Sequence, residues 1–379
     1  MRVTLDVTAV PAAPAGAGRY TLELARALAA LGEPELLLVS RHADRARWED
    51  LAPRPAAIYA AAPGPRPLRL AWEQAGLPRL LRRSGADVHH GPHYTMPERS
   101  SVPVVVTIHD CTFFDHPEWH QRTKVLFFRR AIRVAAKRAA ALVCVSETTA
   151  AALGAHCAVE APVVVAPHGV DHERFSPTEP APGADDTELR RLGVDPERPY
   201  VLFVGTVEPR KDVASLVRAF GRVARRDADV SLVIAGRRGW KDRSVDVALG
   251  SLGPARARVH MLGYVATASL PALLRRAVVV AYPSLAEGYG LPALEALACG
   301  APLVTTHATA MAELAGEAAL LVPAGDAAAL ADAIASVVDA GRADADVARR
   351  RSVGLARAAA LTWDASARRH LDAYRLAAS

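Results

Sequence analysis

The chain has 379 residues, which is long for one hydrophobic core and sufficient for two domains. Hydrophobic residues at 51% and charged residues at 23% are typical of a folded globular protein, and aromatic residues at only 5% disfavour a nucleic-acid-binding surface. The net charge of +6 suits an anionic ligand or an acidic membrane surface.

The first element is an apolar run at residues 2–7 that Asp6 interrupts, so it fits a strand and a following glycine loop better than a signal peptide. Gly16 and Gly18 would let the backbone of this loop approach a ligand closely. A dinucleotide fingerprint needs a third glycine where Thr21 stands, which disfavours a nicotinamide dehydrogenase. No run approaches the roughly 18 apolar residues of a membrane-spanning helix, and we expect a cytoplasmic protein.

Short β-branched runs then alternate with alanine- and arginine-rich helical stretches. The runs lie at residues 35–40, 86–90, 102–110, 140–146 and 161–167 of the first half, and at 200–205, 230–236, 258–262, 277–284, 301–306 and 318–323 of the second. Nearly continuous apolar strands separated by helices predict parallel sheets covered on both faces. We expect an α/β chain with two doubly wound, Rossmann-like domains facing a central cleft, and ligands at the carboxyl ends of the strands.

Polar side chains follow two strands of the first half. His89, His90 and His93 resemble a metal cluster, but contacts to an acceptor or plain loop packing explain them as well. His109 and Asp110 close the run at 102–110. Asp110 could bond His109, an acceptor or a local turn.

A helix with two distinct faces is expected at residues 121–140. One face is basic and the other apolar; the basic residues are Arg122, Arg129, Arg133 and Lys137, and the apolar ones are Val125, Phe128, Ile132 and Ala135. The helix is either packed on the core with a solvated basic side, or it meets an acidic membrane or a lipid-linked diphosphate.

A proline-rich, acidic and polar stretch at residues 176–199 separates the halves, as a domain boundary would. The next strand leads into Arg210 and Lys211, with Asp212 as the N-cap of a helix. Cations are unfavourable at the positive end of a helix dipole. Their position is explained if a diphosphate lies between them and the backbone amides.

The stretch "EGYGLPALE" at residues 287–295 combines two carboxylates with a glycine turn. Pro292 suits a helix that begins near Leu291, so Glu287 precedes the helix and Glu295 lies one turn inside it. Amides of Gly288, Tyr289, Gly290 and Leu291 would face an anion, and the carboxylates would accept hydrogen bonds from hydroxyls. A nucleoside-diphosphate sugar offers both groups. Sequence spacing disfavours a metal but leaves a glycosidase pair possible.

The chain resembles the retaining glycosyltransferases of family 4, which have the GT-B fold. The resemblance rests on "EGYGLPALE", "EPRK", "PHGVD" and the run from 259 to 284, and it extends into the first half through "GAGRY", "HHGPHYTMP", "VTIHDCTFFDHP" and "VSETTA". It covers nearly the whole chain, and the branch it is most similar to is mannosyltransferase-like. Thr206 departs from the arginine that some members place after the strand glycine.

The resemblance implies a role for each candidate residue. Glu287 would hold hydroxyls of the donor sugar and Glu295 the ribose. Arg210 and Lys211 would neutralise the diphosphate, the loop of Gly16 and Gly18 would cover it, and His109 would face the sugar. Acceptor contacts would come from His93, Tyr94 and Asp110.

We therefore expect an acceptor-binding domain at residues 1–177, completed by a helix at 363–379, and a donor-binding domain at 178–362. The expected activity is the retaining transfer of a hexose, without a metal or a cofactor. The donor would be GDP-mannose, and the acceptor would be a sugar or a lipid-linked molecule. The product would belong to polysaccharide, glycolipid or glycosylated-metabolite biosynthesis. The enzyme would work in the cytoplasm or at the inner face of the membrane. A hydrolysing sugar-nucleotide epimerase of the same architecture and a solute-binding protein are the alternatives.

Overall fold

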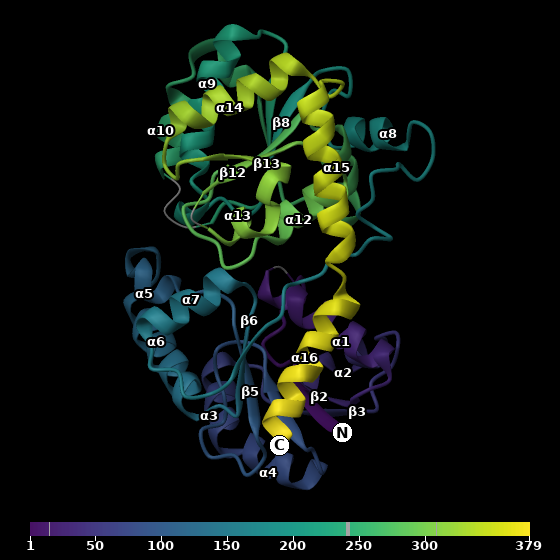
Figure 1. Ribbon diagram of the computed structural model, residues 1–379, viewed down its shortest axis with the longest axis vertical. Coiled ribbons are helices and arrows are strands. Elements are labelled where there is room, and N and C mark those ends of the chain that lie inside the picture. Colours follow the sequence, from purple (N-terminus) through teal and green to yellow (C-terminus); the bar gives the residue numbers. More distant parts are fainter. Residues whose placement is uncertain (15, 240–242, 308) are drawn as a thin grey trace. The chain divides into compact units, whose positions relative to one another are not determined.

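The computed structural model describes residues 1–14, 16–239, 243–307 and 309–379 (Figure 1). The chain divides into two compact units, Met1–Gly169 with Leu361–Ser379, and Val170–Ala360. The boundary expected after residue 177 falls inside the second unit. Residues before the proline-rich stretch already pack there, because Phe175 is fully buried and the Ser176 carbonyl accepts a hydrogen bond from Arg275.

The first unit contains one parallel sheet in the order β3-β2-β1-β4-β5-β6-β7. Its strands are β1 (Arg2–Asp6), β2 (Glu35–Arg41), β3 (Ala57–Ala62), β4 (Val88–Gly91), β5 (Val104–Ile108), β6 (Ala141–Cys144) and β7 (Val163–Val165). Its α-helices are α1 (Ala17–Leu31), α2 (Arg45–Glu49), α3 (Arg66–Ala75), α4 (Leu77–Ser84), α5 (Thr112–Asp115), α6 (Arg122–Arg138), α7 (Glu147–His156) and α16 (Trp363–Ala378).

The second unit repeats this plan with a parallel sheet in the order β10-β9-β8-β11-β12-β13. Its strands are β8 (Tyr200–Val204), β9 (Ser231–Ala235), β10 (Val259–Gly263), β11 (Val279–Tyr282), β12 (Leu303–Thr306) and β13 (Ala319–Val322). Its α-helices are α8 (Ala184–Arg191), α9 (Val213–Arg226), α10 (Arg243–Gly250), α11 (Leu270–Arg276), α12 (Leu291–Ala298), α13 (Ala310–Ala315), α14 (Ala327–Ala340) and α15 (Ala345–Ala360).

Strand β5 shows why these sheets are built from continuous apolar runs. Val104, Val106 and Ile108 pack with α6 in one cluster, whereas Val105 faces the other side and packs with α1 and α16. Successive side chains of a strand point to opposite faces, so a strand covered on both faces must be apolar at every position.

Both sheets change direction at their first strand. In the first unit the chain runs outward from β1 to β3 and then returns to place β4 on the other side of β1. In the second unit β8 and β11 are related in the same way. Ligands of doubly wound sheets bind beyond the carboxyl ends of the strands at this switch point.

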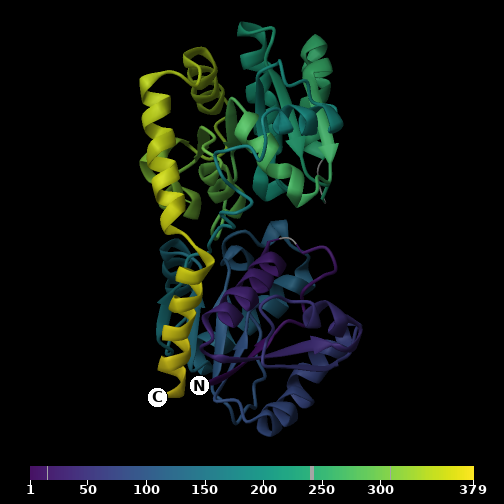
Figure 2. The ribbon, with the colours of Figure 1, turned by 90° about the vertical axis from the view of Figure 1, so that its right-hand side faces the viewer.

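Helix α16 returns to the first unit at the end of the chain (Figure 2). Buried hydrogen bonds join this helix to the rest of the unit. The His370 Nδ1 atom lies 2.7 Å from the Ser366 carbonyl oxygen, which can only accept, so Nδ1 carries the proton. The Nε2 atom of His370 then accepts from the Tyr20 hydroxyl at 2.8 Å. This assignment fixes the direction of every further bond.

The chain of hydrogen bonds continues through β5 and β4 back to the same helix. Tyr20 accepts from the Thr107 hydroxyl at 2.8 Å, and Thr107 accepts from His90 Nε2 at 2.8 Å. His90 Nδ1 accepts from the Tyr374 hydroxyl at 2.8 Å. His90, one of the three histidines considered as metal ligands, is thus part of the bond between α16 and the sheet.

Candidate functional site

The candidate residues of the second unit gather at its switch point, between β8 and β11. Pro209–Lys211 form a 3₁₀ turn after β8, and Asp212 begins α9 by accepting a hydrogen bond from the Ser215 amide at 3.3 Å. The predicted N-cap is therefore confirmed. Asp212 has a φ of 46°, an unusual conformation for a residue other than glycine.

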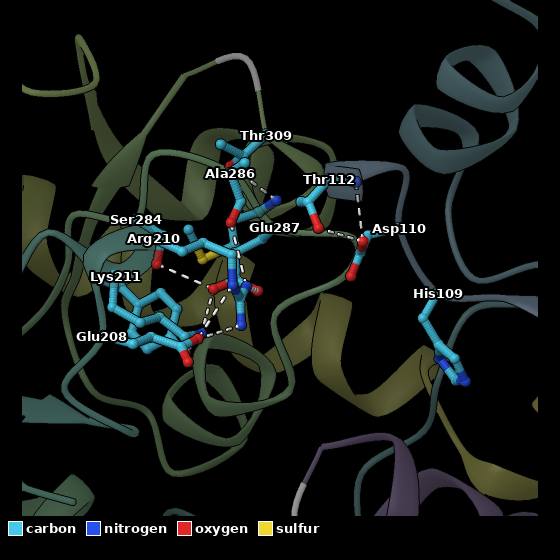
Figure 3. A network of polar contacts seen from close by, with 12 residues as sticks. His109, Asp110, Thr112, Glu208, Arg210, Lys211, Ser284, Ala286, Glu287 and Thr309 are labelled. Carbon is cyan, nitrogen blue, oxygen red and sulfur yellow. Dashed lines mark hydrogen bonds and ion pairs between the residues drawn. The ribbon is translucent and has the colours of Figure 1, made fainter. Parts of the chain in front are cut away.

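One carboxylate joins both candidate cations (Figure 3). Glu287 accepts a hydrogen bond from Arg210 Nη1 at 2.5 Å through one oxygen, and its other oxygen forms an ion pair with Lys211. Glu287 and Lys211 side chains are both 8% exposed. The structure thus brings together three residues that the sequence separates into a phosphate-binding pair and a sugar-binding carboxylate.

The charges of these groups follow from burial and pairing. Burial alone would raise the pKa of Glu287, but Arg210 and Lys211 outweigh it and bring the pKa down to about 2. Burial lowers the pKa of Lys211 to about 8, although Glu287 opposes that change. At neutral pH the site therefore holds two cations and an ionised carboxylate.

Three further side chains position this group, and the sequence-based prediction assigned no role to them. Glu208 accepts from Arg210 at 2.8 Å, and Ser284 donates to Glu287 at 3.1 Å. The Tyr282 hydroxyl accepts from Lys211 at 2.5 Å, and the ammonium lies 4.6 Å from the centre of the Tyr282 ring. All three lie inside stretches that carry the family resemblance, Glu208 in "EPRK" and Tyr282 and Ser284 in the run from 259 to 284, but nothing in those stretches marks the contacts that they make.

The glycine turn leads directly into α12, which begins at Leu291 with a proline in its first turn, as predicted. Gly290 has a φ of 106°, and a Cβ there would lie 2.6 Å from Met311 Cγ, so only glycine fits. Gly288 and Tyr289 are buried, and Glu295 is 2% exposed. The helix thus begins shortly after Glu287 in the chain.

The two glycines after β1, Gly16 and Gly18, lie on either side of the first residue of α1. Gly16, with a φ of 51°, precedes α1, and Gly18 lies in the first turn of α1. A Cβ on Gly18 would meet Pro11 Cδ at 3.0 Å, so this glycine serves packing within the unit. Ala15, in the same loop, lies outside the described residues.

His109 lies at the carboxyl end of β5 among other aromatic rings. Its Nε2–H donates to the Pro92 carbonyl at 2.8 Å, and its ring centre is 5.6 Å from those of both His93 and Tyr94. Burial lowers the pKa of His109, so the ring is neutral with an available lone pair on Nδ1. The structure thus gathers His109 with two of the three predicted acceptor residues.

Asp110 forms hydrogen bonds within a local turn, which is one of the three roles considered for it from the sequence. It accepts from the Thr112 amide at 3.0 Å and from the Thr112 hydroxyl at 2.7 Å, which starts α5. Tyr94 is 9% exposed and packs edge-to-face on Phe113 and Phe128. Both residues therefore have structural contacts within the first unit.

Comparison with known proteins identifies the family. The family model described as Glycosyltransferase Family 4 matches residues 14–174, and that described as Glycosyl transferases group 1 matches residues 198–340. The chain belongs to glycosyltransferase family 4. Nothing in these matches supports the epimerase alternative.

Relatives of this glycosyltransferase span its whole length. The O-antigen chain mannosyltransferase B of Escherichia coli is 29% identical over 95% of this chain and 96% of its own. Among solved structures, the sucrose-phosphate synthase of Thermosynechococcus elongatus has a TM-score of 0.80 at 21% identity, covering 99% of this chain and 98% of its own. Anabaena HepE, solved with UDP, has a TM-score of 0.75 at 19% identity and covers 98% of each chain. The fold is GT-B.

Two features are absent from the described residues. Their His, Cys, Asp and Glu side chains form no group of three or more that could hold a metal ion. None of their helices combines the length and apolar character needed to cross a bilayer.

Proposed function

We propose that this glycosyltransferase moves a hexose, with mannose as the favoured sugar, from a nucleoside-diphosphate donor to an acceptor hydroxyl with retention of configuration. The observation that carries the proposal is the group of Arg210, Lys211 and Glu287 at the switch point of the second unit. A structural neighbour solved with UDP and with UDP-glucose supports a nucleotide-sugar donor. The mannosyltransferase relative supports mannose, and GDP-mannose is the donor we expect.

The group offers positive charge where a diphosphate would need it. Arg210, Lys211 and the amides at the start of α12 would hold the phosphate oxygens, so we propose that a metal is not required. Glu287 would accept hydrogen bonds from sugar hydroxyls, and Glu295 from the ribose.

Donor binding must redistribute the bonds of Glu287, because its carboxylate already contacts both cations. Glu208 remains as a partner for Arg210 and Tyr282 as a partner for Lys211 when the diphosphate shares these cations. The cations would therefore stay in place while the carboxylate turns to the sugar.

The same groups would support retention without a covalent enzyme intermediate. The leaving diphosphate, stabilised by Arg210 and Lys211, can accept the proton of the incoming hydroxyl. The roles of His109, His93, Tyr94 and Asp110 toward sugar and acceptor remain predictions of the family resemblance, as does the covering role of Gly16 and Gly18.

Transfer can be tested by incubating the protein with a panel of nucleotide sugars and a mixture of acceptor glycosides. Mass spectrometry should show a hexose on an acceptor and release of a nucleoside diphosphate, and NMR should show an α linkage from an α donor. An isomerised but untransferred sugar would identify an epimerase, and a β linkage would contradict retention. A Lys211→Met variant serves as the inactive control.

We propose a sugar or lipid-linked acceptor and a place of work in the cytoplasm or at the inner membrane face. The four basic residues of α6 fall into two groups in the structure. Arg129 donates to the Phe113 carbonyl at 2.7 Å and Arg133 lies over the Phe114 ring, so these two hold α5. Arg122 and Lys137 are exposed, and we propose that they contact an anionic membrane surface.

A further inference from the structure

The first unit has its own switch point, between β1 and β4, and polar side chains line it. Asp6 is the last residue of β1, and the loop after β4 carries His93 and Thr95. Because Leu5 of β1 pairs with His90 of β4, Asp6 and this loop leave the sheet side by side. This is the position at which the second unit holds Arg210 and Glu287.

A buried carboxyl group lies beneath this loop. Glu73, from α3, is 7% exposed, and its Oε2 accepts from the Thr95 hydroxyl at 3.1 Å. Its Oε1 is buried with no hydrogen-bond partner. A buried oxygen without a hydrogen bond destabilises the folded chain, so a bound ligand that supplied the missing bond would be favoured here.

The neighbouring charges define what such a partner could be. Burial raises the pKa of Glu73 to about 8, and the charges of Asp6 and Glu98 raise it too, while Thr95 and Arg69 oppose them. Arg69 also interacts with Asp6. Burial raises the pKa of Asp6 too, and its bonds to Thr8 and the charge of Arg69 oppose that rise. The group therefore combines two carboxyl groups, of which Glu73 is mainly protonated at pH 7, with a single guanidinium.

The loop after β4 is held in an unusual conformation. Tyr94 has a φ of 62°, and a Cβ on Gly91 would lie 2.5 Å from the Thr95 carbonyl oxygen. In the described part of the chain, the other non-glycine residue with positive φ is Asp212, at the switch point of the second unit. Backbone strain of this kind concentrates at functional sites.

We propose that Asp6, Arg69, Glu73 and Thr95 form a subsite that binds adjacent hydroxyls of a neutral sugar acceptor. Asp6, Arg69 and Thr95 are half-buried, and Glu73 is buried. Asp6 accepts from hydroxyls, Arg69 donates to sugar oxygens, and the acid proton of Glu73 meets a hydroxyl oxygen. Two carboxyl groups beside a single guanidinium select against a phosphorylated sugar. As an acceptor site the subsite rests on the proposed transferase function, but its binding property can be measured alone.

The test is ligand-observed saturation-transfer NMR on the full chain at pH 7, with methyl α-mannopyranoside as the neutral probe and no nucleotide. The wild type should bind the probe. Asp6→Asn keeps an oxygen for the Thr8 amide, which now donates to Asp6 at 2.8 Å, but loses the charge, so binding should weaken about tenfold or more. Glu49→Gln, an exposed change on α2, is the matched control and should bind like the wild type.

Glu73→Gln separates the proposed role from a purely structural one. The amide keeps an oxygen for Thr95 and donates where the acid proton would, so probe binding should stay within about twofold of the wild type at pH 7. Loss of binding by this variant at unchanged melting temperature would overturn the neutral-acid assignment.

Three other results would overturn the subsite: no probe binding by the wild type, equal binding by Asp6→Asn, or preference for mannose 6-phosphate over the neutral probe. Since no donor is present, these failures would leave the transferase proposal standing. Conversely, absence of transfer in the nucleotide-sugar assay would leave the probe result unchanged.

Discussion

At the scale of single residues, the candidate donor site depends on a carboxylate shared by two cations. Glu287 is the residue for which the sequence and the structure give complementary information. The motif predicts that it binds the donor sugar, and the structure shows that it also neutralises Arg210 and Lys211.

The two glutamates of the motif should respond differently to amide substitution. Glu287→Gln should lower turnover strongly while donor binding survives, because the cations remain and lose a competing carboxylate. Glu295→Gln should weaken donor binding by about 1–3 kcal/mol, the worth of one charged hydrogen bond. Steady-state kinetics with donor titration by calorimetry distinguishes the two. Equal turnover loss with unchanged affinity in both variants would indicate a carboxylate pair in acid–base chemistry.

Lys211 should make donor binding sensitive to alkaline pH. Its folded pKa is about 8, so the charge that attracts a diphosphate disappears as the pH rises through 8, and affinity should fall. Its contribution to stability has the opposite sign, because the unfolded lysine keeps its proton up to about pH 10.5 and stability rises between the two values. Calorimetric titration of a nucleoside diphosphate from pH 7 to 9.5 measures the first effect. Lys211→Met should bind weakly at every pH, and a wild type with flat affinity would refute the assignment.

At the scale of elements, most strands could be predicted because each sheet is covered on both faces and its strands are continuous apolar runs. β3 (Ala57–Ala62) was missed. Four of its six residues are alanines, and five of the six are half-buried at the sheet edge, so neither a β-branched run nor alternation marks it. The starts of α9 and α12 were predicted because Asp212 and Pro292 act locally. The contact of Lys211 with Tyr282 joins two segments that are far apart in the sequence, so no local sequence pattern indicates it.

The hydrogen bonds that hold α16 should make the first unit sensitive to acid. Burial lowers the pKa of His370 to about 4, although its bond to Ser366 opposes this, and burial lowers the pKa of His90 further. The unfolded histidines take up protons below about pH 6.5 while the folded ones stay neutral, so stability falls as the pH drops from 6.5 toward 4. His370 alone should account for a loss of about 3 kcal/mol.

Amide hydrogen exchange in α16 at pH 7 and at pH 4.5 tests this expectation. Protection should decrease more in the wild type than in His370→Gln, which cannot take up the proton. The same pH dependence in both proteins would exclude His370 as its source.

At the scale of the whole molecule, the last helix belongs to the first unit although the second unit precedes it in the chain. Removal of residues 361–379 takes Leu371 and Tyr374 out of their apolar cluster, which should expose the remaining members and unfold the first unit. The second unit keeps its own sheet and core. NMR of the truncated chain should therefore show folded signals for residues 170–360 alone, and retained diphosphate binding. Loss of both units together would show that neither folds without the other.

The proposed membrane contact is an electrostatic property of α6. Liposome co-sedimentation should require anionic lipid and fade as salt rises. Arg122→Gln with Lys137→Gln should abolish it and leave donor binding unchanged, since neither side chain belongs to the second unit. Arg129 is unsuitable for this purpose, because its replacement removes the bonds to the carbonyls of Phe113 and Phe114. A wild type that ignores anionic liposomes at low salt would favour a soluble acceptor.

The order of the segments also bears on how such enzymes recombine. Residues 170–360 form an insertion between two parts of one folded unit, which the chain leaves after Gly169 and re-enters at Leu361. A single genetic crossover between two relatives within residues 170–360 would give a chimera whose α16 comes from a different parent than the sheet it must cover. The hydrogen bonds from Tyr374 and His370 would then have to fit a foreign partner. Exchange of the second unit as a whole requires two crossovers, one near Gly169 and one near Leu361. In the product, the first unit and α16 then come from the same parent.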